Sequence, residues 1–198
     1  MLPDRSLQTG LPRMLGSMLE LDANGWAVGI VDPMPVEHAW SLVSPEPSSR
    51  VDAGRWAHQA RTFFGAIVEL QDPKSYPSAT LPLADAGVLE IRRIATIDTE
   101  PPSRVFFSTL PLDRAPAVRA AAMRGAEAIG GAGFDVLVQR GQRLWQVQDA
   151  APGGDPRAPL AVAALIASVF LAPILPPGGG TLFGVKGARE RLERLGWR

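Results

Sequence analysis

The stretch SRVDAGRWAHQARTFFGAIVEL, residues 49–70, contains the clearest periodic pattern in the chain. Ser49 and Asp52 have the spacing of a helix-capping box. Behind them, apolar side chains recur at intervals of three and four: Trp56, Ala60, Phe63, Phe64, Ile67 and Leu70. This periodicity predicts a helix over residues 53–70 whose apolar face packs on a sheet.

Strand patterns lie on both sides of this helix. Residues 36–43 alternate between apolar and polar positions, as a half-buried strand does. Residues 88–98 and 104–112 predict two further strands. A second helix is predicted from Asp113 to Ile129, ending at a pair of glycines. Its apolar stripe consists of small side chains, so we expect that face to approach a neighbouring element closely.

Two predicted hairpins extend the pattern. In the first, Asp22-Ala23-Asn24-Gly25 separates apolar residues 18–22 from 26–31, and Asn-Gly favours a tight turn. The second pairs residues 134–139 with residues 144–148. The first hairpin precedes the strands and helices described above. The second provides one more strand of that series, residues 134–139, and one extra strand after it.

From about residue 36 to 140 the predicted order is strand, helix, strand, strand, helix, strand. This is the βαββαβ order of a ferredoxin-like core in an α+β fold, here with an extra N-terminal hairpin and an extra strand. We expect residues 1–150 to form the core domain. Residues 151–198 then form a linker, an apolar helix and a short charged helix packed on the core or a partner. The architecture carries no function by itself.

The composition excludes several classes of function. The 198 residues are 46% apolar and 20% charged, which is typical of a folded globular protein. Twenty basic and twenty acidic residues cancel, so no nucleic-acid partner is expected. All basic residues except Lys74 and Lys186 are arginines, which indicates a bacterial-like composition.

Missing residue types narrow the chemistry further. The chain has no cysteine and only two histidines, His38 and His58. Disulfides, thiolate nucleophiles and three-histidine zinc sites are therefore excluded, and we expect neither a metal nor a cofactor. There is no G-x-S-x-G nucleophile motif, and residues 1–21 lack a signal-peptide pattern, so a cytoplasmic location is expected.

Residues 158–185 contain no charged side chain, and residues 160–175 are their most apolar part. A helix that is apolar on every side must be covered on most sides. Sixteen residues are more than a typical buried helix needs and fewer than the ~20 of a membrane span. Three interpretations stay open: a helix in the core or at an interface, a membrane-associated segment, or a contact with another copy.

Arg93 is the most unusual polar residue of the predicted strands. The strand period of two places it on the same face as Leu89 and Ile91. A buried charge is costly unless it is paired, so Arg93 is a candidate clamp for a carboxylate or phosphate. The alternatives are a bulge between Arg92 and Arg93, or an arginine whose head reaches solvent at the sheet edge.

His38 lies on the apolar side of the first predicted strand and is a candidate acid or base. The alternative is a hydrogen-bonded histidine of the core or edge. In the ferredoxin-like order one strand separates His38 from Arg93, a distance of about 10 Å. A small anionic ligand could then contact both, with Arg92 as a further ligand-binding candidate.

Gly179 and Gly184 have the spacing of a phosphate-binding loop, but the Lys-Ser/Thr that should follow is missing. The chain is also too short beyond Gly184 for a dinucleotide-binding unit. Lys186 could still provide the counter-charge for an organic phosphate at the start of the last helix. The alternative is that these glycines only turn the chain.

Two functions follow from these patterns. The first is a non-catalytic binding or assembly subunit whose apolar segment, residues 158–185, contacts a protein partner or another copy. The second is a small-molecule enzyme without metal or thiol chemistry. It would act on an anionic substrate, with His38 as acid or base and Arg93 as the anion clamp.

Overall fold

The computed structural model describes residues 20–21, 27–28, 31–47, 51–70, 86–150 and 154–197. Its main element is a six-stranded antiparallel sheet in the order β4-β5-β6-β7-β3-β8. The strands are β3 (Trp40–Ser44), β4 (Ala66–Leu70), β5 (Ala86–Arg93), β6 (Ser103–Pro111), β7 (Arg143–Asp149) and β8 (Ile174–Leu175). The helices are α1 (Ala53–Phe64), α2 (Pro116–Glu127), α3 (Phe134–Gln139), α4 (Ala158–Phe170) and α5 (Val185–Arg194). The predicted α+β class is confirmed.

The N-terminal hairpin forms a small sheet of its own. Strand β1 (Glu20–Leu21) pairs antiparallel with β2 (Ala27–Val28), with Glu20 opposite Val28. This confirms the pairing predicted around the Asn-Gly turn. The turn itself, residues 22–26, lies outside the described residues.

The helix predicted over residues 53–70 is too long. Helix α1 ends at Phe64, because Gly65 takes up a left-handed conformation with φ of 58° and closes the last turn. The following residues leave the helix and form β4, which pairs with β5. Ile67 and Leu70 fit the helical spacing, but an alternating strand accommodates them equally well.

The strand predicted at residues 134–139 is a helix, α3. Three glycines with positive φ, at 130, 131 and 133, end the helical segment that contains α2 and redirect the chain into α3. Six residues are too few for the apolar period to distinguish helix from strand. With β4 gained and this strand lost, the predicted ferredoxin-like topology is not confirmed.

Two predicted strands are shorter than expected. Residues 36–39 form a turn, and β3 begins only at Trp40. Strand β5, near the opposite edge of the sheet, stops at Arg93, and residues Ile94–Thr96 form a single 3-10 turn. Both changes alter the position of a candidate site residue.

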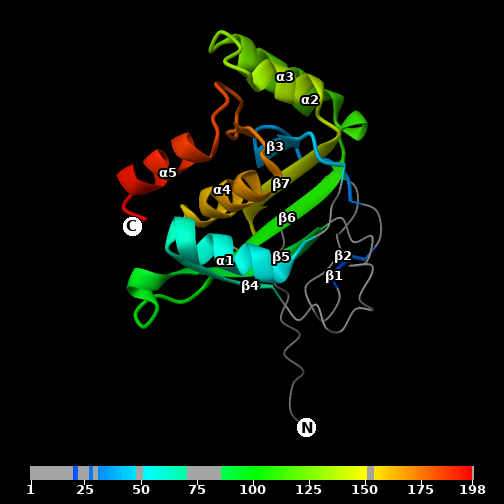
Figure 1. The fold of residues 1–198 in the computed structure, drawn as a ribbon. Helices are drawn as coiled ribbons and strands as arrows, with labels where there is room; N and C mark the ends of the chain where they lie inside the picture. Colours follow the sequence, from blue (N-terminus) through cyan, green and yellow to red (C-terminus); the bar gives the residue numbers. More distant parts are fainter. Residues whose placement is uncertain are drawn as a thin grey trace.

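Helices α1 and α4 lie against one face of the sheet, with α5 beside α4 (Figure 1). An aromatic cluster joins these layers. Trp56 of α1 lies 6.0 Å from Trp145 of β7, and Trp145 stacks on Phe170 of α4 at 4.7 Å, between ring centroids. The largest apolar contacts of the fold therefore connect the two helices to the middle of the sheet.

Helix α4 occupies the centre of this layer. Every one of its residues except Ser168 is buried, by the sheet, by α1 and by α5. The apolar run is thus covered by its own chain, which explains why the helix needs no polar face. No helix among the described residues is long and apolar enough to cross a membrane.

The opposite face of the sheet is partly covered by residues 31–39. The buried amide of Gln146 fixes this segment, because its Oε1 accepts from Met34 N at 2.7 Å and its Nε2 donates to Met34 O at 2.8 Å. The same Nε2 donates to Ser41 Oγ at 3.2 Å. One side chain therefore satisfies both the backbone N–H and the backbone carbonyl of Met34 in the covering segment.

The small face of α2 approaches its neighbour as predicted. A Cβ atom on Gly125 would lie 2.5 Å from the carbonyl oxygen of Gly180, which is too close for any side chain. Leu182 N donates to the carbonyl of Gly125 at 3.4 Å. Glycine at 125 is therefore required by the backbone contact between α2 and the loop that follows β8.

Candidate functional site

A cavity of about 380 Å³ lies where the end of β5, the loop before β6, the start of α4 and the C-terminal turn meet. Three arginines and two carboxylates line it, together with apolar groups that include Ile91 and Trp197. A cavity of this volume is within the range of small-molecule sites in proteins. It is the best-formed candidate site in the part of the chain that the structure describes.

Arg93 reaches this cavity from the last position of β5. The register between β4 and β5 is continuous through Arg93, which pairs with Ala66, so there is no bulge. Arg93 therefore shares the face of Leu89 and Ile91, as the strand period predicts. Its side chain is only 12% exposed, and β5 is an interior strand, so it is not an edge residue reaching for solvent.

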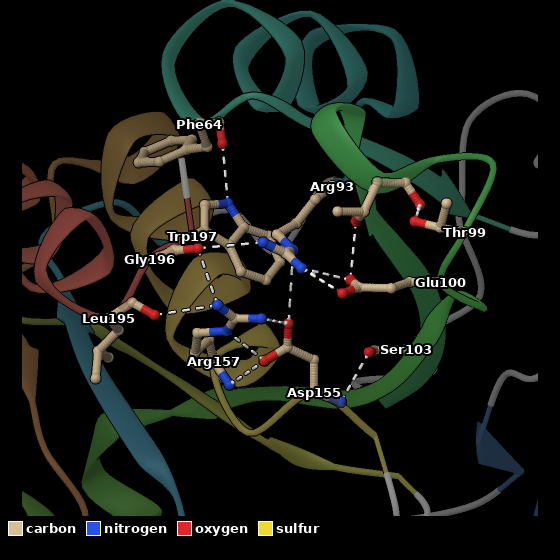
Figure 2. A network of polar contacts seen from close by, with 11 residues as sticks. Phe64, Arg93, Thr99, Glu100, Ser103, Asp155, Arg157, Leu195, Gly196 and Trp197 are labelled. Carbon is tan, nitrogen blue, oxygen red and sulfur yellow. Dashed lines mark hydrogen bonds and ion pairs between the residues drawn. The ribbon is translucent and has the colours of Figure 1, made fainter.

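Three groups surround the Arg93 guanidinium (Figure 2). Nη2 donates to both carboxylate oxygens of Glu100, at 2.5 and 2.6 Å, and Nη1 donates to the carbonyl of Gly196 at 3.1 Å. Nε lies 3.8 Å from an oxygen of Asp155. The charge on the apolar face thus has carboxylate partners, while the buried Nε makes no hydrogen bond to the described residues.

Asp155 and Arg157 form the second half of the network. The guanidinium of Arg157 donates through Nε and Nη2 to the two oxygens of Asp155, both at 2.7 Å. Its Nη1 donates to the carbonyls of Leu195 and Gly196 at 3.0 and 2.9 Å. The backbone N–H of Asp155 donates to Ser103 Oγ at 3.0 Å, which ties this pair to β6.

We call the four side chains Arg93, Glu100, Asp155 and Arg157 the C-terminal clasp, because their two arginines hold the carbonyls of the C-terminal turn. Trp197 completes the attachment: it is buried, and its indole Nε1 donates to Phe64 O at the end of α1, at 2.9 Å. The clasp joins parts of the chain that are more than 100 residues apart.

Both carboxylates of the clasp are ionised at neutral pH. Hydrogen bonds from Arg93 and then Thr96 lower the pKa of Glu100. Burial raises the pKa of Asp155, but the hydrogen bonds and charge of Arg157 outweigh burial and lower the pKa overall. These two charges balance those of Arg93 and Arg157.

The structure does not bring the predicted acid or base to this cavity. His38 is exposed in the turn before β3, and its N–H donates to Pro35 O at 3.1 Å. Strands β6 and β7 both lie between β3 and β5, whereas the predicted order placed one strand there. The arrangement in which one small ligand contacts His38 and Arg93 is therefore absent, and the reason is the failed ferredoxin-like order.

The two other predicted ligand-binding residues have different positions. Arg92 lines the cavity, and its Nη2 lies 3.7 Å from Glu69 on the neighbouring strand. Lys186 is exposed in the first turn of α5, outside the cavity. The glycines at 178–180 all have positive φ, and Gly178 N donates to Val36 O at 3.0 Å. They turn the chain, as the alternative interpretation of that loop predicted.

Sequence reasoning did not find Glu100, Asp155, Arg157 or Trp197. Glu100 lies next to two prolines and Asp155 lies in the linker, so each looks like an ordinary solvated residue. The sequence did indicate that Arg93, on an apolar face, needs a carboxylate partner. That requirement limits the partner to an acidic residue but does not identify which one.

Comparison with known proteins finds no matching family model, no similar curated protein and no similar solved structure. Among the described residues, no group of three or more acidic or histidine side chains could hold a metal ion. The function of this protein is therefore inferred from its own geometry.

Proposed function

We propose that the protein is a non-catalytic assembly subunit that binds a second copy of itself at the end of the molecule formed by α1, α5 and the C-terminal turn. The observation that carries this proposal is a set of exposed large apolar side chains around that end. Phe63 is 41% exposed, Ile94 39% and Leu195 54%. Large apolar side chains grouped on a surface are typical of protein contacts.

These residues belong to neighbouring elements. Phe63 is in the last turn of α1, and the N–H of Ile94 donates to the carbonyl of Gly65 at 2.8 Å, directly after that helix. Phe63 also borders a shallow depression together with Leu192, Arg189 and Glu193 of α5. An apolar centre with charges at its side is the common pattern of an interface.

The surface is held rigidly. Leu195 lies in the turn whose carbonyls accept from Arg157 and Arg93, and Trp197 is fixed to Phe64. A backbone that is already held in place loses little conformational entropy when a partner binds. The clasp therefore supports the proposed interface by ordering it before contact.

The charges beside Phe63 favour a second copy as the partner. Arg189 and Glu193 are one helical turn apart and both border the depression. In a two-fold dimer the same surface faces itself, so Arg189 of one copy can pair with Glu193 of the other. A surface that carries both signs of charge is self-complementary in this arrangement.

The contact surface differs from the segment that sequence patterns suggested. Helix α4 is buried by its own chain, so it offers no apolar face. Within residues 158–185 the exposed large apolar side chain is Leu171, at 73%. The enzyme interpretation with His38 and Arg93 gains no support, because the two residues do not share a cavity.

Sedimentation velocity over a range of protein concentrations tests the proposal. We expect the wild type to form a dimer, and Phe63→Ser or Leu195→Ser to shift the equilibrium to the monomer. Val136→Ser on α3 is the matched control, because Val136 is 42% exposed and lies on a different part of the fold. A wild type that stays monomeric at every concentration would exclude this assembly.

A further inference from the structure

We propose that the cavity beside the C-terminal clasp binds a small organic monocarboxylate, and that Glu100 occupies the position of the ligand carboxylate until the ligand displaces it. The cavity shares the C-terminal turn with the proposed dimer contact, but ligand binding and dimer formation are measured separately, so either can fail without the other. Four observations support it: the apolar walls of the cavity, the Nε of Arg93 without a hydrogen-bond partner among the described residues, the exposure of Glu100 and the net charge of the groups around the cavity.

The walls suit a short carbon chain with one charged end. Ile91, Pro101, Pro102 and Trp197 provide apolar surface, and Arg93 and Arg157 line the same space. Sites for small organic molecules combine mostly apolar walls with a few convergent polar groups. The two rigid proline rings also limit how far that wall can collapse into the space.

The chain's own groups do not fully satisfy Arg93. Within the described residues its buried Nε has no hydrogen-bond partner, and the nearest carboxylate oxygen, from Asp155, is 3.8 Å away. A buried guanidinium usually uses its donors in paired bonds to a carboxylate. Arg93 instead directs one nitrogen, Nη2, at both oxygens of Glu100.

The two carboxylates of the clasp are held very differently. Asp155 is 16% exposed and accepts two side-chain bonds and one backbone bond from Arg157. Glu100 is 46% exposed and lies in the loop that precedes β6. Glu100 can swing outward into water and free Arg93 for a ligand carboxylate, whereas three hydrogen bonds from Arg157 hold Asp155 in place. Glu100 is therefore the exchangeable carboxylate.

The charge balance sets the charge of the ligand. When Glu100 leaves, Arg93 and Arg157 face Asp155 alone, which leaves one net positive charge. Arg92 does not add to this charge, because the strand period turns its side chain to the other face of the sheet, where Nη2 lies 3.7 Å from Glu69. A monoanion neutralises the remaining charge. The group that Arg93 holds now is a carboxylate, which points to a monocarboxylate whose carboxyl group replaces that of Glu100.

Isothermal titration calorimetry of the protein with propionate, at constant ionic strength, tests the site. We expect saturable binding of one propionate per chain. Glu100→Gln removes the internal competitor and should tighten binding about tenfold, because a larger fraction of the protein is then ready to bind. Arg93→Gln should abolish binding. Asp98→Asn, an exposed charge change on the same loop, is the matched control and should leave the affinity unchanged.

The gain in affinity is the decisive result, because misfolding cannot produce it. If Glu100 only supports the fold, E100Q will bind propionate no better than the wild type, and the proposal is wrong. Failure of both proteins to bind propionate at millimolar concentrations also overturns it. Inorganic phosphate serves as a second ligand: if it binds more tightly than propionate, the carboxylate assignment is incorrect.

Discussion

Helix α4 and the C-terminal turn are close together in the fold but are held in place by different forces. Helix α4 has no charged side chain and is buried on nearly every side, so apolar burial holds it. The C-terminal turn leaves Leu195 exposed and is held by hydrogen bonds from two arginines to its carbonyls. The first attachment should respond to side-chain volume, and the second to charge, salt and pH.

The largest effect is expected in α4. Leu165 is 1% exposed and belongs to the main core. Leu165→Ala should lower the free energy of unfolding by about 3 kcal/mol, from lost burial and the cavity left behind. Urea denaturation measures this loss, which should be the same at low and high salt. A loss below about 1 kcal/mol would show that α4 is not the centre of the core.

An intermediate effect is expected from the clasp. Arg157→Ala removes the bonds to Asp155 and to two carbonyls, and we expect a loss of about 2 kcal/mol. High salt should reduce this difference, unlike that of L165A, because the interaction is electrostatic. Arg140→Ala, at an exposed position, is the control and should change stability little. Equal salt responses in R157A and L165A would remove the distinction between the two regions.

The pH dependence follows from the lowered pKa of Asp155. Its folded pKa lies below the unfolded value, so the carboxylate stabilises the fold at neutral pH. That contribution is lost as the pH falls through the folded pKa. Asp155→Asn should therefore be clearly less stable than the wild type at neutral pH, and the difference should shrink as the pH falls below the ordinary aspartate pKa of about 3.9.

Asp149 provides the control with the opposite sign. Burial and then the charge of Asp155 raise its pKa, so its ionised form costs stability at neutral pH. Asp149→Asn should leave stability unchanged or raise it slightly there, in urea titrations matched to those of D155N. If both asparagine variants lose the same stability, the clasp does not depend on the ionised form of Asp155.

The smallest effect is expected where α4 ends. Leu171 has a φ of 52° and is 73% exposed, so it combines a left-handed backbone with little packing. Leu171→Gly removes the steric cost of this conformation but increases the entropy of the unfolded chain. A net gain of about 0.5 kcal/mol is expected in thermal or urea unfolding. A loss of more than 1 kcal/mol would mean that Leu171 contributes packing to the core.

The sequence predicted those features that depend on one element alone. Alternation placed Arg93 on the apolar face of its strand, and the absence of charge over residues 158–185 required a covered helix. It could not identify Glu100 or Gly196 as partners of Arg93. They come from separate segments, and only the three-dimensional fold brings them together.

The incorrect predictions have a common physical cause. Residues 66–70 and 134–139 are short apolar stretches in which helical and strand periods both fit. Glycines with positive φ lie next to them, at 65 and within 130–133, and these glycines decided whether each stretch became a helix or a strand. The error in these two segments then misplaced His38 relative to Arg93, because strand order depends on every strand being assigned correctly.

The central position of α4 has a consequence for how the protein is made. Strands β3 to β7 all leave the ribosome before residue 158, yet Trp145 and Phe107 depend on the last fifth of the chain for their cover. Until then, the nascent sheet presents an uncovered apolar surface of the kind that chaperones bind. A chain cut before α4 would keep most of its strands and lose the element that makes them soluble.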